Sequence, residues 1–207
     1  MSRRERPGRS GPSGSEGPGP GSDTASDTGP DAGRPGPRAG ARYFVRDAAP
    51  ADLHAVMAMK AASWREAYGG LRDEGFFAVA EASLNRQVEH WRRHLAAGHA
   101  LWLAEDARGR CVGMAAAGPS RADAGDGLPD TELYAMYVLA AAQGSGVADA
   151  LLERAVGEGP CHLRVVAGNG RARAFYARHG FTAEGTQEPL DGPWAGLDEQ
   201  SMVRRGA

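Results

Sequence analysis

A short glycine-containing turn is the segment of this sequence whose residue types could most readily do chemistry. Gln143 to Ala148 reads Gln-Gly-Ser-Gly-Val-Ala and stands between a run typical of a strand and a run typical of a helix. The first amides of a helix have no carbonyl partner inside it, and together they carry about half a positive charge. Gly144 and Gly146 have no Cβ atom to keep a phosphate from the backbone. The turn therefore predicts an anion site, best suited to a pyrophosphate. An ordinary turn that only connects a strand to a helix would produce the same pattern.

The sequence on both sides of this turn alternates between stretches whose apolar residues have the period of a strand and stretches whose apolar residues have the period of a helix. Pro50 opens a first helix that Gly69 and Gly70 end. The remaining expected helices cover 84–95, 146–156 and 169–179, and the expected strands cover 43–46, 100–105, 111–117, 131–138, 161–166 and about 199–204. Strands with interleaved helices imply a layered α/β or α+β domain.

Composition excludes several classes of protein. The 207 residues include 24 basic and 26 acidic ones, a balance of −2 that does not suit a phosphate-tracking nucleic-acid binder. There is no apolar run near 18 residues and no secretory h-region, so neither a membrane span nor a signal peptide is expected. Two cysteines, Cys111 and Cys161, are too few for a disulfide framework and suit a reducing cytoplasm, which is the expected location.

The N-terminal segment differs from the rest of the chain. Residues 1–40 contain 10 Gly, 7 Pro and 6 Ser, and no aromatic or branched aliphatic side chain. Such a segment cannot bury enough apolar surface to offset an ordering entropy of roughly 1–2 kcal/mol per residue. We therefore expect a disordered tail over 1–40 and one domain over 41–207.

A second motif follows the glycine turn and indicates a family. The turn itself has neither the Lys-Ser/Thr pair of a P-loop nor the GxGxxG spacing of a Rossmann fold. The two motifs in order are Gln143-x-x-Gly146-x-Ala148 and Asn169-x-x-Ala172-x-x-Phe175-Tyr176-x-x-x-Gly180-Phe181. Together they resemble the GCN5-related N-acetyltransferase (GNAT) superfamily, over about residues 42–205.

The resemblance implies a fold, a cosubstrate and a set of contacts. The fold would be a mixed α/β (α+β) domain: a twisted mixed sheet, flanked by helices, whose central strands splay apart around acetyl-CoA. The residues expected to pair with pantetheine are Met136, Tyr137 and Val138. The residues expected to cradle the pyrophosphate are Gln143, Gly144, Ser145, Gly146, Val147, Ala148 and Asp149. On the following helix, the resemblance assigns cofactor contacts to Asn169, Ala172, Phe175 and Tyr176.

The resemblance also assigns catalytic roles. An amine with a pKa of about 10.4 is almost wholly protonated at pH 7, so a base or a water relay is expected to help. Glu132 stands where the histone acetyltransferases of this superfamily place their general base, although a solvated carboxylate at a strand start is the alternative. Tyr176 would protonate the departing thiolate, and the backbone N–H of Tyr137 or Val138 would bind the oxyanion. The alternative for Tyr176 is an aromatic side chain packed in the core. No metal is expected, because no His/Cys spacing of ligand type occurs.

The sequence says less about the substrate that accepts the acetyl group. The stretch Trp64-x-x-Ala67-Tyr68-x-Gly70-Leu71 resembles a signature of many bacterial members of the superfamily without an assigned substrate. Trp64, Tyr68 and Phe76 could form an aromatic wall over an acceptor site, while an amphipathic helix pair covering the sheet is the alternative.

Two functional hypotheses follow. The first is an acetyl-CoA-dependent N-acetyltransferase acting on a primary amine of a small molecule or peptide by direct transfer. The second is a non-catalytic acetyl-CoA-binding sensor or interaction module. Neither a nucleic acid nor a membrane is expected as a partner. The sequence leaves open whether the protein forms a homodimer.

Overall fold

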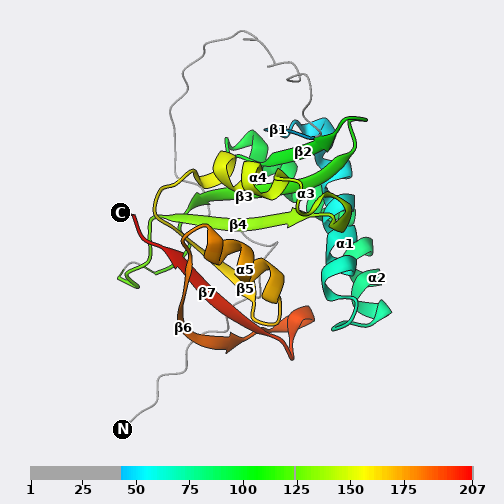
Figure 1. The fold of residues 1–207 in the computed structure, drawn as a ribbon. Helices are drawn as coiled ribbons and strands as arrows, with labels where there is room; N and C mark the ends of the chain where they lie inside the picture. The colour runs from blue at the N-terminus through cyan, green and yellow to red at the C-terminus, as the bar shows by residue number, and fades with distance from the viewer. Residues whose placement is uncertain (1–42, 124, 207) are drawn as a thin grey trace.

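The computed structural model describes residues 43–123 and 125–206. The predicted tail over 1–40 lies outside the described residues. The strands form one mixed seven-stranded sheet in the order β1-β2-β3-β4-β5-β7-β6 (Figure 1). Their bounds are β1 Tyr43–Asp47, β2 Trp102–Asp106, β3 Cys111–Pro119, β4 Thr131–Val138, β5 Cys161–Val166, β6 Thr182–Pro189 and β7 Asp198–Arg204.

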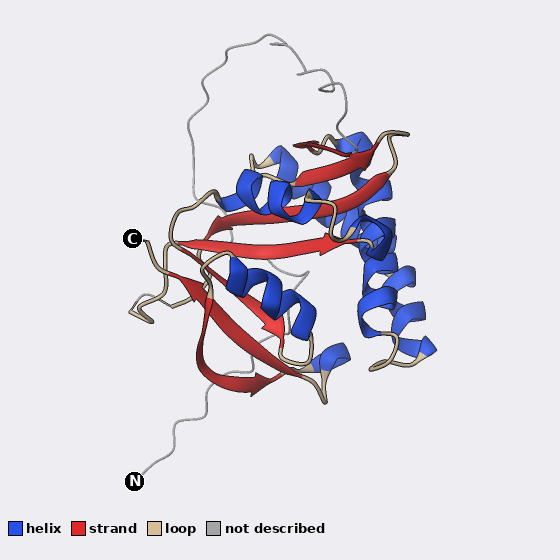
Figure 2. Cartoon of the chain, viewed as in Figure 1, coloured by secondary structure: helices blue, strands red, loops and turns tan. Residues whose placement is uncertain are grey.

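Five α-helices cover the sheet in the described part of the chain (Figure 2). Their bounds are α1 Leu53–Tyr68, α2 Glu74–Ala82, α3 Leu84–Ala96, α4 Val147–Val156 and α5 Gly170–Arg178. Short 3-10 turns lie at Pro50–Asp52, Ala140–Ala142 and Gly192–Trp194. None of the described helices is long and apolar enough to cross a membrane.

The two faces of the sheet are covered by different helices. On one face, Leu151 of α4 and Tyr176 of α5 pack against sheet residues such as Ala115 and Leu163. On the other face, α1 and α3 bury another set of side chains, including Leu53, Val56, Met57 and Val88. The period of the apolar residues on α1 predicted this helix and its buried face, and both are confirmed. The predicted mixed α/β class is confirmed as well.

The two central strands separate soon after they begin. Parallel pairing of β4 with β5 is confined, in the described residues, to Glu132 with His162 and Leu133 with Leu163. On its other edge β4 pairs with β3 as far as Val138. The inner edge of β4 beyond Leu133 is therefore turned toward the gap that opens between the strands.

Two elements were not predicted from the sequence. Helix α2 begins after Asp73, whose carboxylate accepts a hydrogen bond from Phe76 N at 2.9 Å. Strand β6 pairs antiparallel with β7 at the edge of the sheet, and almost all of its residues are exposed. An edge strand without a buried face has no apolar alternation, so the periodicity of the sequence does not reveal it.

Candidate active site

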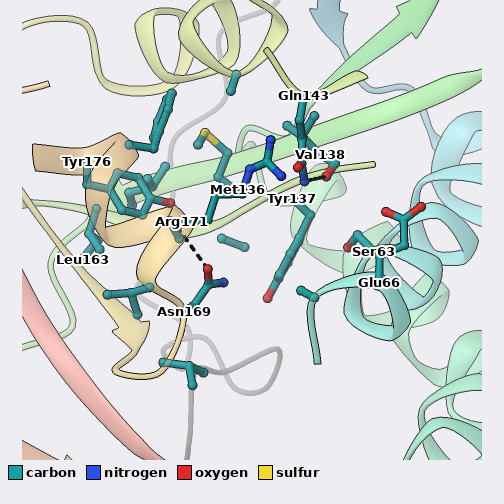
Figure 3. A pocket seen from close by; sticks show the side chains of 18 of the residues that line it. Ser63, Glu66, Met136, Tyr137, Val138, Gln143, Leu163, Asn169, Arg171 and Tyr176 are labelled. Carbon is teal, nitrogen blue, oxygen red and sulfur yellow. Dashed lines mark hydrogen bonds between the residues drawn. The ribbon is translucent and has the colours of Figure 1, made fainter. Parts of the chain in front are cut away.

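The opening between β4 and β5 contains a cavity of about 530 Å³ (Figure 3). Its walls come from β4, β5, α5 and the C-terminal half of α1. Of the predicted site residues, those that line it are Tyr68, Met136, Tyr137, Val138, Gln143, Gly144, Ala148, Asn169, Ala172, Phe175 and Tyr176. The predicted residues outside its lining are Trp64, Phe76, Glu132, Ser145, Gly146, Val147 and Asp149.

The glycine turn lies at one end of this cavity, between β4 and α4. Gly144 and Gly146 have φ angles of +75° and +87°, the left-handed region that glycine adopts without strain. Within the described residues, no heavy atom beyond the adjacent residues lies within 4 Å of an ideal Cβ at either position. The first helical hydrogen bond of α4 runs from Ala150 N to Gly146 O at 3.0 Å, so the preceding amides have no carbonyl partner within the helix. The turn therefore presents amide donors to open space, as an anion site requires.

Several side chains of the turn have structural partners. Gln143 donates from Nε2 to Val138 O at 3.0 Å, which ties the turn to the end of β4 (Figure 3). Val147 is buried in the core under α4. Asp149 lies 2.9 Å from His179 Nε2. For these positions, any contact with an anion would come from the backbone.

Tyr176 lies on α5 at the side of the cavity that faces β4 (Figure 3). Only 6% of the residue is exposed, and its ring packs edge-on against Phe181. Burial raises the pKa of the Tyr176 phenol well above its ordinary value of 10.0, with Tyr137 and Tyr68 adding to the effect. The phenol is therefore protonated at neutral pH, as a proton donor must be.

The Asn169 side chain makes two hydrogen bonds at the start of α5. Its Oδ1 accepts a hydrogen bond from Ala172 N at 3.0 Å, which caps the helix. Its Nδ2 donates to the hydroxyl of Tyr68 at 3.4 Å. This contact connects α5 to α1 across the cavity.

Glu132 lies next to the cavity-lining Leu133 but does not itself line the cavity. Its carboxylate accepts hydrogen bonds from Arg121, at 3.0 Å from the backbone N and at 2.6 Å from Nη2. Burial opposes ionisation of Glu132, but the hydrogen bonds and charge of Arg121 outweigh it, so the pKa lies below its ordinary value. The side chain is thus a buried carboxylate that is already paired.

The aromatic residues near α1 form a packed cluster. The ring centroids of Trp64 and Trp194 are 5.0 Å apart, and those of Phe76 and Trp194 are 4.9 Å apart, both in edge-on geometry. Tyr68 and Trp194 line the cavity, whereas Trp64 and Phe76 lie behind them. The sequence did not single out Trp194, because it lies over a hundred positions from Tyr68 and in no motif.

Charged residues that were not among the predicted site residues also line the cavity. They are Glu66 on α1, Arg164 on β5, and Arg171 and Arg178 on α5. Arg164 is paired with Glu199 at 2.5 Å. Arg171 follows the helix cap Asn169 by two residues. This position is the feature of the sequence that could have indicated a basic group beside the cap.

Known proteins share both the sequence pattern and this architecture. A family model described as an acetyltransferase (GNAT) domain matches residues 97–183. The protein named Probable N-acetyltransferase Rv2775 from Mycobacterium tuberculosis is 30% identical over 156 residues, which cover 72% of this chain and 86% of that protein.

Solved structures give the same fold. The PaiA N-acetyltransferase from Thermoplasma acidophilum, solved in complex with coenzyme A, matches with a TM-score of 0.61 and 18% identity, over 79% of this chain and 98% of that one. The structure of yncA from Salmonella typhimurium with acetyl-CoA matches with a TM-score of 0.54 and 20% identity, over 79% and 94% of the chains. These likenesses concern the fold, which in this chain is a mixed sheet whose central strands splay apart and a glycine turn that precedes a helix. This chain belongs to the GNAT acetyltransferase family.

Proposed function

We propose that this protein transfers the acetyl group of acetyl-CoA to a primary amine of a small molecule or peptide. The observation that carries the proposal is that the inner edge of β4, the glycine turn and the Tyr176 phenol all border one cavity. An amide-bearing arm can pair with a free strand edge as an added strand would. A pyrophosphate suits the amides before α4. The donors present therefore fit acetyl-CoA, and two structural relatives were solved with coenzyme A or acetyl-CoA.

The chemistry is a direct transfer in which the amine nitrogen bonds to the acetyl carbonyl carbon and the carbon–sulfur bond breaks. Tyr176 gives its proton to the sulfur as the carbon–sulfur bond breaks, and the attacking amine loses one proton to a base or a water. The backbone N–H of Tyr137 or Val138 stabilises the charge that develops on the carbonyl oxygen. Arg171 and Arg178 add positive charge along the α5 wall, next to which the phosphates would lie.

A calorimetric titration with acetyl-CoA, and with free coenzyme A alongside, tests the proposal. We expect binding in the micromolar range, followed by release of free thiol when primary amines are added. Binding without turnover on a broad amine panel would support the sensor hypothesis instead. No binding at millimolar acetyl-CoA would contradict both.

Replacing Gly144 by Ala tests the glycine turn. The φ of +75° costs a residue with a Cβ about 1–2 kcal/mol, and the new methyl group would enter the space next to the turn amides. We expect the Kd for coenzyme A to rise about tenfold or more. Gly185→Ala is the matched control, since Gly185 has a φ of +72° on the exposed strand β6. Equal affinities for the two variants would remove the turn from the binding site.

We retain Glu132 as the candidate base, acting directly or through water, and a pH profile tests it. If Glu132 accepts the proton, Glu132→Gln should lose activity at pH 7 and regain part of it at pH 9, where more of the amine is already neutral. Arg121→Gln provides the comparison, since it removes the partner of Glu132 and leaves the carboxylate. An equal loss at both pH values in Glu132→Gln would show that Glu132 acts by holding Arg121.

A further inference from the structure

The cavity has one acidic side chain among the described residues that line it. Glu66 projects from α1 on the side of the cavity opposite α5 (Figure 3). Its Oε2 accepts a hydrogen bond from Ala140 N at 2.7 Å. No ion pair joins Glu66 to another residue in the ranges that the structure describes. The Glu66 carboxylate therefore lies on the cavity wall without an ion-pair partner from these ranges.

The opposite wall has the opposite charge. Arg171 and Arg178 lie on α5, and Arg164 on β5 is already paired with Glu199. Under the proposed function, the α5 side attracts the phosphates of coenzyme A. The α1 side is then left to attract a positive charge on the acceptor.

We propose that Glu66 selects acceptors that carry two basic nitrogens, such as a short aliphatic diamine. This inference rests on the proposed function and names its acceptor class. The attacking nitrogen must be neutral, whereas a carboxylate stabilises the protonated form of an amine beside it. The nitrogen held by Glu66 is therefore not the one that is acetylated, and a second nitrogen must reach the thioester.

The spacing along the chain from the end of β4 to the 3-10 turn at Ala140–Ala142 is consistent with two nitrogens. The amide proposed to bind the oxyanion belongs to Tyr137 or Val138, and the amide that holds Glu66 belongs to Ala140. Two to three residues of extended chain separate these amides, which corresponds to roughly 7–10 Å. A carboxylate beside Ala140 thus lies apart from the amides proposed to bind the oxyanion, so the nitrogen that it holds and the nitrogen that attacks can be different ones.

A purely structural role for Glu66 gives different expectations. As a clamp between α1 and the turn at Ala140, Glu66 needs only an acceptor oxygen, which Gln also has. Glu66→Gln would then behave as the wild type, and Glu66→Ala alone would be destabilised. For recognition of a cation, the charge itself is required and Glu66→Gln is sufficient to lose it.

The test is a calorimetric titration of 1,4-diaminobutane and of 1-aminobutane into the complex with coenzyme A, together with steady-state kinetics on both amines. We expect the wild type to bind the diamine more tightly, and Glu66→Gln to weaken diamine binding about tenfold. The same variant should raise the KM for the diamine more than it lowers kcat. Glu89→Gln, which removes an exposed carboxylate of α3 outside the cavity, should behave as the wild type.

The outcomes separate this inference from the proposed function. Equal affinity for the two amines in the wild type, or equal diamine affinity in the wild type and Glu66→Gln, would overturn the role of Glu66. Acetyl transfer to amines would still stand in that case. A wild-type protein that does not bind coenzyme A would overturn the proposed function and this inference together.

Discussion

Tyr176→Phe is expected to lower kcat by a factor of about 10 to 1,000, the range for loss of a general acid. The phenol lies at the cavity, and burial keeps its pKa above the ordinary value, so it holds its proton throughout the neutral range and has one to give as the thiolate forms. Phe retains the ring that packs against Phe181, so the helix and the cavity should persist. Steady-state kinetics with thiol detection measures the change in kcat, and calorimetry should show little change in coenzyme A affinity.

Tyr43→Phe is the matched control, because it removes a phenol from β1, outside the cavity lining. Its kcat should equal that of the wild type. An unchanged kcat in Tyr176→Phe would exclude Tyr176 from proton transfer and leave it a core aromatic. A large loss of coenzyme A affinity in that variant would indicate a binding role instead.

Lys60→Met is expected to increase the free energy of unfolding at pH 7 by up to about 3 kcal/mol. Lys60, the single lysine of the chain, is 4% exposed, and burial lowers its pKa from 10.5 to about 8. Each unit of such a shift corresponds to about 1.4 kcal/mol between the protonated and neutral forms. The Nζ atom has one hydrogen bond, to Gln87 Oε1 at 3.1 Å, and lies 4.8 Å from the Trp64 ring. These contacts offset part of the cost of burial, so the expected gain is an upper value.

The pH dependence of this effect has a definite sign. Below pH 8, Lys60 is protonated in both states, and the native state bears the full cost of the buried charge. Between pH 8 and 10.5 the native state releases its proton first, so the unfolded state binds more protons and the stability contributed by Lys60 rises. The advantage of Lys60→Met should therefore shrink across this window.

Denaturant unfolding of wild type and variant at pH 7, 8.5 and 10 measures this difference, and contributions from other groups cancel. Arg86→Met removes an exposed cation from α3 and should change stability little at any of these pH values. A constant difference between Lys60→Met and wild type from pH 7 to 10 would mean that the Lys60 pKa is not lowered. A destabilised variant would show that the Gln87 and Trp64 contacts outweigh the cost of burial.

Local patterns in the sequence were sufficient for the elements with a buried face. The apolar period of α1 and the glycines before α4 each follow from the conformations that nearby residues allow. The edge strand β6 and helix α2 were not predicted from the sequence. Almost all residues of β6 are exposed, so it has no apolar alternation, and α2 begins at a helix cap in a stretch to which no element had been assigned. The conformation of the glycine turn could be predicted for the same local reason as α4, and its role as an anion site stays a prediction. The roles of Glu132 and Tyr176 stay predictions that the experiments above test, and the aromatic wall of Trp64, Tyr68 and Phe76 stays a prediction as well.

By itself, then, the sequence determined the fold family, most of the elements in their order and the glycine turn, because each depends on residues close together in the chain. Only the tertiary structure decided which side chains share the cavity. It brings Glu66 to Ala140 across 74 positions, pairs Glu132 with Arg121, and packs Trp64 behind Trp194. These contacts depend on which strands and helices pack against each other. The spacing of neighbouring residues in the sequence does not reveal that packing.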